Sequence, residues 1–310
     1  MMDKNSKIYI AGHNGLVGSA IKRALEKQGY DNIIFRSSAE LDLRDQTATE
    51  DFFKKETPEY VFLAAARVGG VKANMEKPAE FIYDNLQIQT NVIHFSHKYG
   101  VKKLLFLSSN CVYPKEAPQP FKEEYLLQGP PEIPNEPYAI AKIAGMKLCQ
   151  AYQKQYGNKF ISVMPASLFG PNDNFDLQNS HFVPALVRKF HEAHINGKDF
   201  VELWGTGKPR REIMHVDNAA MACIFLMNEY DGIEPVNIGV EYDYTILDIA
   251  KMVARVTGFN GRIIFDETKP DGVMRKLLDS SKITNFGWKP QLSLEDGLRQ
   301  TYQWFMEQYG

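Results

Sequence analysis

The regular alternation of short apolar segments with helical patterns is the feature that most constrains this chain. In the first helical stretch, Val17, Ala20, Ile21 and Leu25 recur at helical spacing. We predict strands at Lys7–Gly12, Asn32–Arg36, Tyr60–Ala65, Lys103–Ser108 and Phe160–Pro165. Strands that alternate with helices pair in parallel. The pattern therefore predicts an α/β fold with a doubly wound parallel sheet that helices cover on both faces.

The pattern becomes less regular after Pro171. We predict helices at Val183–His194, at Asp217–Glu229 with Asp217 as its cap, at Ile246–Thr257 and at Leu294–Met306, a turn over Trp204–Pro209 and a further strand at Pro235–Gly239. We expect two closely packed domains with a cleft at the C-terminal ends of the strands. Residues 1–170 and 212–240 form the first, and residues 171–211 and 241–310 form a smaller, mixed α/β domain.

Charge and cysteine content exclude several classes of protein. The chain has 310 residues with 36 basic and 38 acidic side chains, so it has no positive field to attract nucleic acid or an anionic membrane. No apolar run reaches the roughly 18 residues that cross a bilayer, and the N-terminus does not resemble a signal peptide. Cys111, Cys149 and Cys223 are too widely spaced for a disulfide framework or a zinc site. We expect a cytoplasmic protein without a metal.

A glycine-rich turn joins the first predicted strand to the first predicted helix. It reads G-x-x-G-x-x-G, and glycines allow the backbone to approach a pyrophosphate at the helix N-terminus, where unpaired N–H groups favour an anion. This context predicts a Rossmann-like dinucleotide-binding domain. The candidate cofactor-binding residues of the turn are Gly12, His13, Asn14, Gly15, Leu16, Val17 and Gly18.

The end of the second predicted strand bears on which nicotinamide cofactor binds. Arg36 stands there, and an arginine suits the 2′-phosphate of NADP, whereas an acid would favour NAD. Asp42 either hydrogen-bonds the adenine side of the cofactor or caps the helix that follows. Further cofactor contacts are expected beside these positions and at the other strand ends, from Leu43, Ala64, Ala65, Leu107, Pro165, Ser167 and Leu168.

Tyr138 and Lys142 share one face of a helix that is entered through Pro137 and closed by Gly157. A phenol ionises near pH ~10, and a nearby ammonium is expected to lower that pKa. Such a tyrosine exchanges a proton with a carbonyl or alkoxide oxygen while a hydride moves at carbon. Tyr99 and Lys103 have the same spacing, but the glycine after Tyr99 ends the helix, so they cannot share a face.

Ser109 ends the fourth predicted strand, where ligands sit in doubly wound folds. Its hydroxyl is placed to share a substrate oxygen with Tyr138 as an oxyanion partner. The glycine turn, Ser109, Tyr138 and Lys142 together indicate a reductase.

These residues resemble the extended short-chain dehydrogenase/reductases over nearly the whole chain. More narrowly, the chain resembles the branch of that family that converts GDP-4-keto-6-deoxy-D-mannose to GDP-L-fucose by 3,5-epimerisation and NADPH-dependent 4-keto reduction. The resemblance is carried by AGHNGLVGS at Ala11–Ser19, CVYP at Cys111–Pro114, NEPYAIAKIAGMKLC at Asn135–Cys149, NSHFVP at Asn179–Pro184, RKFH at Arg188–His191, WGTG at Trp204–Gly207 and KPDG at Lys269–Gly272.

The resemblance implies roles for particular residues. Ser109, Tyr138 and Lys142 fall on the reductase triad, and Cys111 and His181 fall on the epimerase acid/base pair. The substrate-binding positions are Lys189, Trp204, Arg211 and Asp271, and His181 is also expected beside the cofactor. Cysteine and histidine suit epimerisation because their ordinary pKa values, near ~8.5 and ~6.5, lie on either side of neutral pH. The resemblance also implies a homodimer.

Several positions depart from the family pattern. Asn14 stands where the family usually has an arginine, and Ser38 where it often has a second one, which leaves NADPH or NADH preference open. Asn110 and Ser167 also differ, so a related sugar such as a heptose stays open. The alternatives are a pure 4-reductase, a 4,6-dehydratase, disfavoured because Asn110 and Cys111 replace its acidic pair, and a non-catalytic NADP-sensing protein.

Overall fold

Six parallel strands form the central sheet of the computed structural model, which describes residues 1–177, 180–269 and 271–310. The strands are β1 (Ile8–Ala11), β2 (Ile33–Ile34), β3 (Tyr60–Leu63), β4 (Lys103–Leu107), β5 (Lys159–Pro165) and β10 (Val236–Ile238). Their order is β10-β5-β4-β3-β1-β2. Successive strands are added on one side of β1 up to β2 and on its other side from β3 onward, so the strand order reverses between β1 and β3. The predicted doubly wound parallel sheet is confirmed, and ligands of such folds bind at this reversal, beyond the strand ends.

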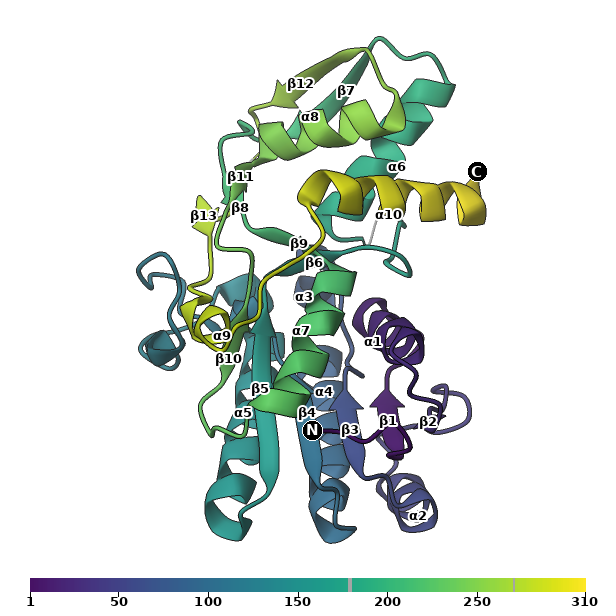
Figure 1. The fold of residues 1–310 in the computed structure, drawn as a ribbon. Coiled ribbons are helices and arrows are strands. Elements are labelled where there is room, and N and C mark those ends of the chain that lie inside the picture. The colour runs from purple at the N-terminus through teal and green to yellow at the C-terminus, as the bar shows by residue number, and fades with distance from the viewer. Residues whose placement is uncertain (178–179, 270) are drawn as a thin grey trace.

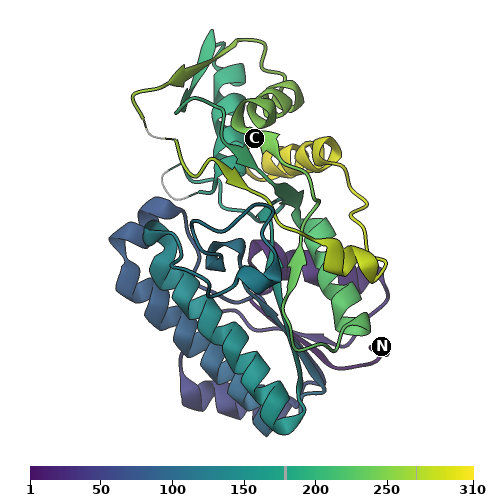
Figure 2. The same cartoon turned by 90° about the vertical axis from the view of Figure 1, so that its left-hand side faces the viewer.

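Helices cover both faces of this sheet, which explains why its strands are almost continuously apolar (Figures 1 and 2). On one face lie α1 (Leu16–Lys27) and α7 (Val216–Glu229), and on the other α2 (Gln46–Glu56), α4 (Pro78–Lys98) and α5 (Glu136–Tyr156). The short helices α3 (Val71–Glu76) and α9 (Ser281–Asn285) and the 3₁₀ turns Asn110–Val112, Glu123–Tyr125 and Ile133–Asn135 complete this part.

The remaining elements form an upper lobe above the C-terminal ends of the strands (Figure 1). It contains α6 (Phe182–Ile195), α8 (Ile246–Thr257) and α10 (Leu294–Tyr309), with β7 (Phe200–Trp204) paired to β12 (Arg262–Asp266). A three-stranded sheet has the order β11 (Tyr244–Thr245), β8 (Arg210–Arg211), β13 (Arg275–Lys276). At the junction of the lobes, β6 (Ser167–Phe169) pairs with β9 (Ile213–His215).

Each lobe has its own hydrophobic core. The lower core is built on the central strands, and Leu278, Ile283 and Trp288 from the C-terminal part of the chain also pack into it. The upper core lies between α6, α8 and α10. The two lobes are therefore packed separately, and the cleft expected between them stays a prediction.

Two local expectations are wrong. The cap of α7 is His215, whose Nδ1 accepts the Asp217 N–H at 3.3 Å, so Asp217 lies inside the helix. The capping alternative for Asp42 also fails, because Asp45 caps α2 by accepting the Ala48 N–H at 3.0 Å. In both cases the residue that takes the cap has the extended backbone that a cap needs.

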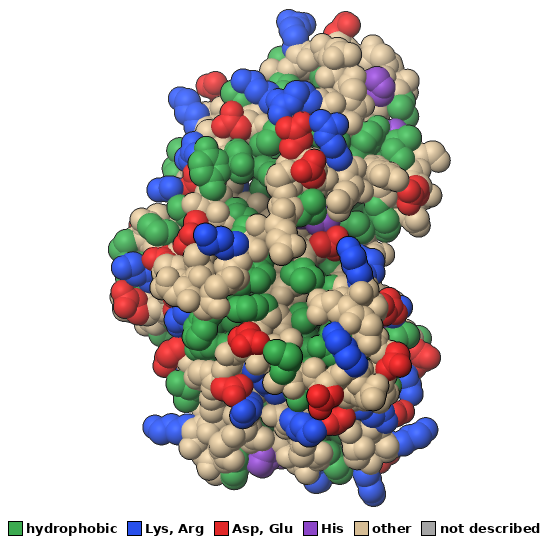
Figure 3. All heavy atoms as spheres, in the orientation of Figure 1, with side chains coloured by type: hydrophobic (Ala, Val, Ile, Leu, Met, Phe, Trp, Pro, Cys, Tyr) green, Lys and Arg blue, Asp and Glu red, His purple; other side chains and the backbone are tan. Residues whose placement is uncertain are grey.

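The surface carries both signs of charge. Acidic and basic side chains are interspersed over the face in Figure 3, as the net charge of −2 leads one to expect. No helix among the described residues is long and apolar enough to span a bilayer. Within the same residues, no three His, Cys, Asp or Glu side chains are grouped to hold a metal ion.

Candidate active site

The glycine turn packs tightly against the end of β3. Gly12 has φ +89, and a Cβ there would lie 2.6 Å from the Ala65 backbone nitrogen. A Cβ at Gly18 would lie 2.1 Å from the Gly12 carbonyl oxygen. Only glycine fits these two positions, so the N-terminus of α1 lies directly on the turn, with its free N–H groups at the reversal in strand order. The structure thus brings Ala64 and Ala65 beside the predicted turn.

The end of β2 meets the same turn. The His13 ring packs on Phe35, with their centroids 4.5 Å apart, and Lys22 lies 5.0 Å from the Phe35 ring centroid. Arg36 is paired through Nη2 with Glu56 at 2.9 Å. Burial, followed by repulsion from Lys22, lowers the pKa of His13. This corner therefore contains the two cations Arg36 and Lys22, each paired with a glutamate, Glu56 and Glu26 respectively.

Asp42 lies near the same end of the sheet, on the side where the adenine is expected. Its carboxylate is held by Arg44, whose Nη2 donates to Oδ2 at 2.7 Å and whose Nε donates to Oδ1 at 2.9 Å. These hydrogen bonds hold the pKa of Asp42 below its usual range. Arg44 also reaches the buried Asp84, so the carboxylate of Asp42 is fixed in place as an acceptor.

The predicted triad lies where α5 passes the end of β4. Lys142 is buried, and its Nζ donates to the Leu107 carbonyl oxygen at 2.9 Å and lies 5.8 Å from the Tyr138 ring centroid. The Ser109 hydroxyl is close enough to Tyr138 to hydrogen-bond its phenol. Ser109 also accepts the Cys111 N–H at 3.3 Å, which starts the following 3₁₀ turn. The structure therefore gathers Leu107, Ser109, Cys111, Tyr138 and Lys142 into one cluster.

The pKa of Tyr138 is raised rather than lowered as expected, and groups other than Lys142 cause the shift. Burial raises the pKa of the phenol, the nearby Cys111 adds to the rise, and the Ser109 hydrogen bond opposes it. Burial lowers the pKa of Lys142 to about 7. Its ammonium points to the Leu107 carbonyl and the Phe106 ring, 4.8 Å from the centroid, rather than to an anion. Tyr138 is consequently protonated at neutral pH, which is the form that donates a proton.

His181 lies at the N-terminus of α6 on the upper lobe, with 49% of its side chain exposed. It makes no side-chain cap hydrogen bond. Its Nδ1 is 3.9 Å from an oxygen of Asp173, a buried residue whose other carboxylate oxygen has no hydrogen-bond partner among the described residues. Cys149 and Cys223 are remote and fully buried, and burial raises the pKa of each thiol to about 12.

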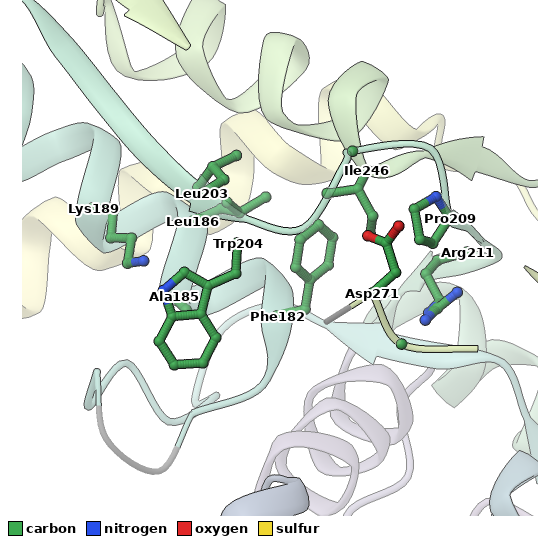
Figure 4. A pocket seen from close by; sticks show the side chains of 12 residues that line it. Phe182, Ala185, Leu186, Lys189, Leu203, Trp204, Pro209, Arg211, Ile246 and Asp271 are labelled. Carbon is green, nitrogen blue, oxygen red and sulfur yellow. The ribbon is translucent and has the colours of Figure 1, made fainter. Parts of the chain in front are cut away.

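All four predicted substrate-binding residues line one pocket of about 250 Å³ in the upper lobe. Lys189 of α6 and Arg211 of β8 lie at opposite ends, with Trp204 and Asp271 between them (Figure 4). Trp204 is 68% exposed, and its ring, which has Lys269 Nζ 5.8 Å from its centroid, presents a planar surface to a ligand. Arg211 donates to the backbone carbonyls of Arg210 and Val273, and burial lowers its pKa.

Two distant motifs meet in this pocket. Asp271 accepts from the Thr206 N–H at 2.9 Å and from its hydroxyl at 2.7 Å. Gly205 has φ +79, and a Cβ there would lie 2.2 Å from an Asp271 oxygen. The WGTG turn therefore holds the KPDG loop by its aspartate. Asn179 and Pro270, which belong to two of the quoted motifs, lie outside the described residues.

Sequence reasoning missed three polar residues near the site. Asp173 reads as an ordinary turn residue after Gly170-Pro171, and Thr206 as part of a glycine turn. Glu212 reads as a surface acid beside two arginines, yet it is buried. The apolar Ile213 and Met214 that follow it are the local signal that Glu212 enters a buried segment.

The fold and site define a dinucleotide-binding α/β protein with a serine–tyrosine–lysine cluster at the strand ends. Residues 8–239 match the model of the NAD dependent epimerase/dehydratase family, and the chain belongs to that family. It is 57% identical over 307 residues to GDP-L-fucose synthase 1 of Arabidopsis thaliana, covering 99% of this chain and 95% of that protein. It is 50% identical over 310 residues to GDP-L-fucose synthase of Escherichia coli (strain K12), covering 97% of each.

A solved structure shows the same fold. A GDP-mannoheptose C4 reductase from Campylobacter jejuni with NADP bound superposes with a TM-score of 0.91 at 42% identity, covering 99% of this chain and 100% of that chain. The family resemblance stated from the sequence and the expectation of an enzyme are both confirmed.

Proposed function

We propose that this enzyme converts GDP-4-keto-6-deoxy-D-mannose to GDP-L-fucose, by epimerising C3 and C5 and then reducing the C4 ketone with NADPH. One observation carries the proposal: the Ser109 Oγ that hydrogen-bonds the Tyr138 phenol also accepts the Cys111 N–H at 3.3 Å, so the thiol residue adjoins the serine–tyrosine pair. In this proposal the acid/base thiol of Cys111 and the proton donor of the reduction, Tyr138, act on one bound sugar. The GDP-L-fucose synthases at 50–57% identity support the same reaction.

The division of the chain follows this proposal. Residues 1–170 and 212–240 bind the cofactor, and residues 171–211 and 241–310 bind the nucleotide-sugar. The glycine cradle fits a dinucleotide because a Cβ at Gly12 or Gly18 would collide with backbone atoms. Arg36 and Lys22 beside the turn suit a 2′-phosphate, and the NADP-bound reductase supports NADP(H) as the cofactor. Lys189 and Arg211 suit the diphosphate of GDP.

The epimerisation requires two proton-transfer groups on opposite faces of the sugar. One group of the Cys111–His181 pair removes the proton from the carbon beside the ketone, and the electron pair moves onto the C4 oxygen. The hydroxyls of Ser109 and Tyr138 stabilise that enolate oxygen. The other group returns a proton from the opposite face, so the carbon inverts and the ketone re-forms. The same sequence operates at C3 and at C5.

The reduction uses the same oxygen contacts. When bound, NADPH supplies a hydride for C4. Tyr138 donates its phenolic proton to the developing C4 alkoxide, and the Ser109 hydroxyl holds that oxygen. Lys142 fixes the helix that carries Tyr138 to the end of β4 through the Leu107 carbonyl, on the side of the site where the cofactor is expected. A phenol kept protonated by burial suits this direction of transfer.

The test is product analysis by NMR in deuterated water with GDP-4-keto-6-deoxy-D-mannose and NADPH. The expected product is GDP-L-fucose with deuterium at C3 and C5. The Cys111→Ser variant should lose deuterium incorporation at these carbons. A Cys149→Ser variant is the matched control, because Cys149 is buried away from the site, and it should behave as the wild type. Wild-type reduction without deuterium at either carbon would contradict the proposal.

A pure 4-reductase of a related sugar is the second candidate. It is favoured by the 42% identity and near-complete coverage of the GDP-mannoheptose C4 reductase. When a GDP-4-keto-heptose is supplied in place of the 6-deoxy sugar, such an enzyme would reduce the heptose faster. It would also leave the Cys111→Ser variant as active as the wild type.

We also infer a homodimer through α4 and α5. Tyr83 on α4 and Ile140 and Tyr156 on α5 are large apolar residues left exposed on neighbouring helices. A second copy of the same pair of helices would cover them. Sedimentation of the wild type should give twice the mass of the 35.3 kDa chain, and Ile140→Glu should give the monomer.

A further inference from the structure

Glu212 is a buried acid that the proposed reaction does not use. It follows the central strand β8 of the three-stranded sheet and precedes β9, where the chain returns from the upper lobe to the lower one. Only 2% of its surface is exposed. A buried carboxylate is retained where its oxygens are satisfied by donors that depend on it.

Three backbone N–H groups donate to this one side chain. Glu212 Oε1 accepts from Val240 at 2.7 Å and from Glu241 at 2.9 Å, and Oε2 accepts from Leu278 at 2.8 Å. Glu241 is held in the left-handed region, at φ 56, although it is not a glycine. That backbone turn lets two successive N–H groups converge on one oxygen.

The three segments that these hydrogen bonds join are connections between the two lobes. Val240 and Glu241 connect β10 of the central sheet with β11 above it, and Leu278 follows β13 on the way down to α9. Leu278 is anchored below by a parallel bridge to Phe121. Glu212 itself is bonded through its N–H to the Lys276 carbonyl at 3.0 Å. One side chain thus fastens the three strands β11, β8 and β13 at their lower end.

The fastened sheet carries Arg211. Arg211 directly precedes Glu212, lies in β8 and reaches into the pocket that also holds Trp204 and Asp271 (Figure 4). On the opposite side of the sheet, Asp243 pairs with Arg210 and Arg275, which ties β11 to β8 and β13 within the upper lobe. Glu212 therefore ties this sheet to the segment that follows β10, while the Lys276–Glu132 ion pair and the Leu277 N–H bond to Gln119 tie β13 to the lower lobe.

We propose that Glu212 is a positioning residue. It holds Arg211 at a fixed position relative to the lower, cofactor-binding lobe, so that the sugar of a nucleotide-sugar bound by Arg211 lies at Tyr138. The inference rests on the proposed function, because it takes Arg211 to contact the diphosphate of GDP. Loss of the carboxylate frees the sheet to move relative to the lower lobe. Binding of a ligand that uses Arg211 then weakens, whereas a ligand confined to the glycine turn is unaffected.

Two variants test this on the full-length protein. Glu212→Gln puts an amide NH₂ against one of the three N–H donors. Gly239→Ala leaves Glu212 intact but displaces it, since a Cβ at Gly239 would lie 2.3 Å from Glu212 Oε1. Glu241→Gln is the matched control, because it removes a neighbouring charge at an exposed side chain and keeps the backbone N–H.

The readouts are the Kd of GDP by calorimetry and the Kd of NADPH by fluorescence. We expect Glu212→Gln and Gly239→Ala to weaken GDP binding at least tenfold, to change NADPH binding less than twofold, and Glu241→Gln to change neither. Equal weakening of both ligands would show a merely structural role and overturn the inference. Unchanged GDP binding in both variants would also overturn it while the proposed function stands. A wild type that binds no GDP would overturn the proposed function itself.

Discussion

The Nζ of Lys142 donates a hydrogen bond to the carbonyl oxygen of Leu107 across 2.9 Å, and so joins α5 to the end of β4. This bond sets the distance between the helix that carries Tyr138 and the strand end that carries Ser109. The two hydroxyls converge because one buried ammonium links their elements. The relationship between Lys142 and Leu107 is therefore as important to the geometry of the site as the charge of the lysine.

Tyr138→Phe removes the proton donor of the reduction. We expect kcat for NADPH oxidation to fall by about 10²–10⁴-fold, the usual contribution of a general acid. The Kd of NADPH should change little, because the phenol acts on the sugar oxygen. Stopped-flow NADPH oxidation and a fluorescence titration measure the two quantities. A variant with wild-type kcat would exclude Tyr138 as the acid.

Lys142→Met should change the pH dependence of stability. Burial lowers the pKa of Lys142 from its ordinary 10.5 to about 7, so between these values the unfolded chain binds more protons than the folded one. The cost of burying the charge is complete below pH 7 and disappears as the pH rises to 10.5. Replacement by methionine removes this cost, which we put at about 5 kcal/mol from about 1.4 kcal/mol per pKa unit.

Urea unfolding of both proteins from pH 6 to pH 10 checks this prediction. The free energy of unfolding of the wild type should rise relative to that of Lys142→Met as the pH increases. The lost bond to Leu107 lowers the stability of the variant by the same amount at every pH, so it does not affect the slope. Parallel curves would show that Lys142 titrates normally.

Arg36→Ala should reduce the preference for NADPH over NADH. We expect the Kd of NADPH to rise about tenfold, since hydrogen bonds to a charged group contribute about 1.5–3 kcal/mol. The Kd of NADH, which lacks the 2′-phosphate, should be unchanged. Lys27→Ala, in the last turn of α1, is the control for a lost surface cation. An equal loss for both cofactors would place Arg36 away from the phosphate.

Gly18→Ala should separate α1 from the glycine turn. The added Cβ would lie 2.1 Å from the Gly12 carbonyl oxygen, which a methyl group cannot tolerate without moving the backbone. We expect a loss of about 1–3 kcal/mol in the free energy of unfolding, typical of overpacking, and more than a tenfold rise in the Kd of NADPH.

Gly29→Ala is the matched control for this substitution. Its φ is +79, but nothing lies within 4 Å of the added Cβ. It should lower stability through backbone strain by about 1 kcal/mol and leave NADPH binding intact. Weakened cofactor binding in Gly29→Ala as well would mean that stability, rather than the turn, controls the affinity.

Much of the fold could be predicted because local patterns report burial. The strands from Ile8 to Pro165 and the helix after the glycine turn were visible as apolar runs and helical spacing. The strands of the upper lobe were not predicted: β8, β11 and β13 have only two residues each and show no period, and the five-residue strands β7 and β12 were also missed. Pairing between segments that are distant in the chain creates these strands.

The sequence by itself determined the doubly wound order, the cofactor turn and the identities of the chemical groups, since spacing and residue type are local properties. Only the tertiary structure decided how those groups are tuned and joined. Burial reversed the direction expected for the pKa of Tyr138, and Glu56 paired with Arg36. Packing also placed Asp173 3.9 Å from His181 and let the Glu212 side chain bond segments of three connections between the lobes. Desolvation and long-range contacts arise from packing, which a linear pattern does not encode.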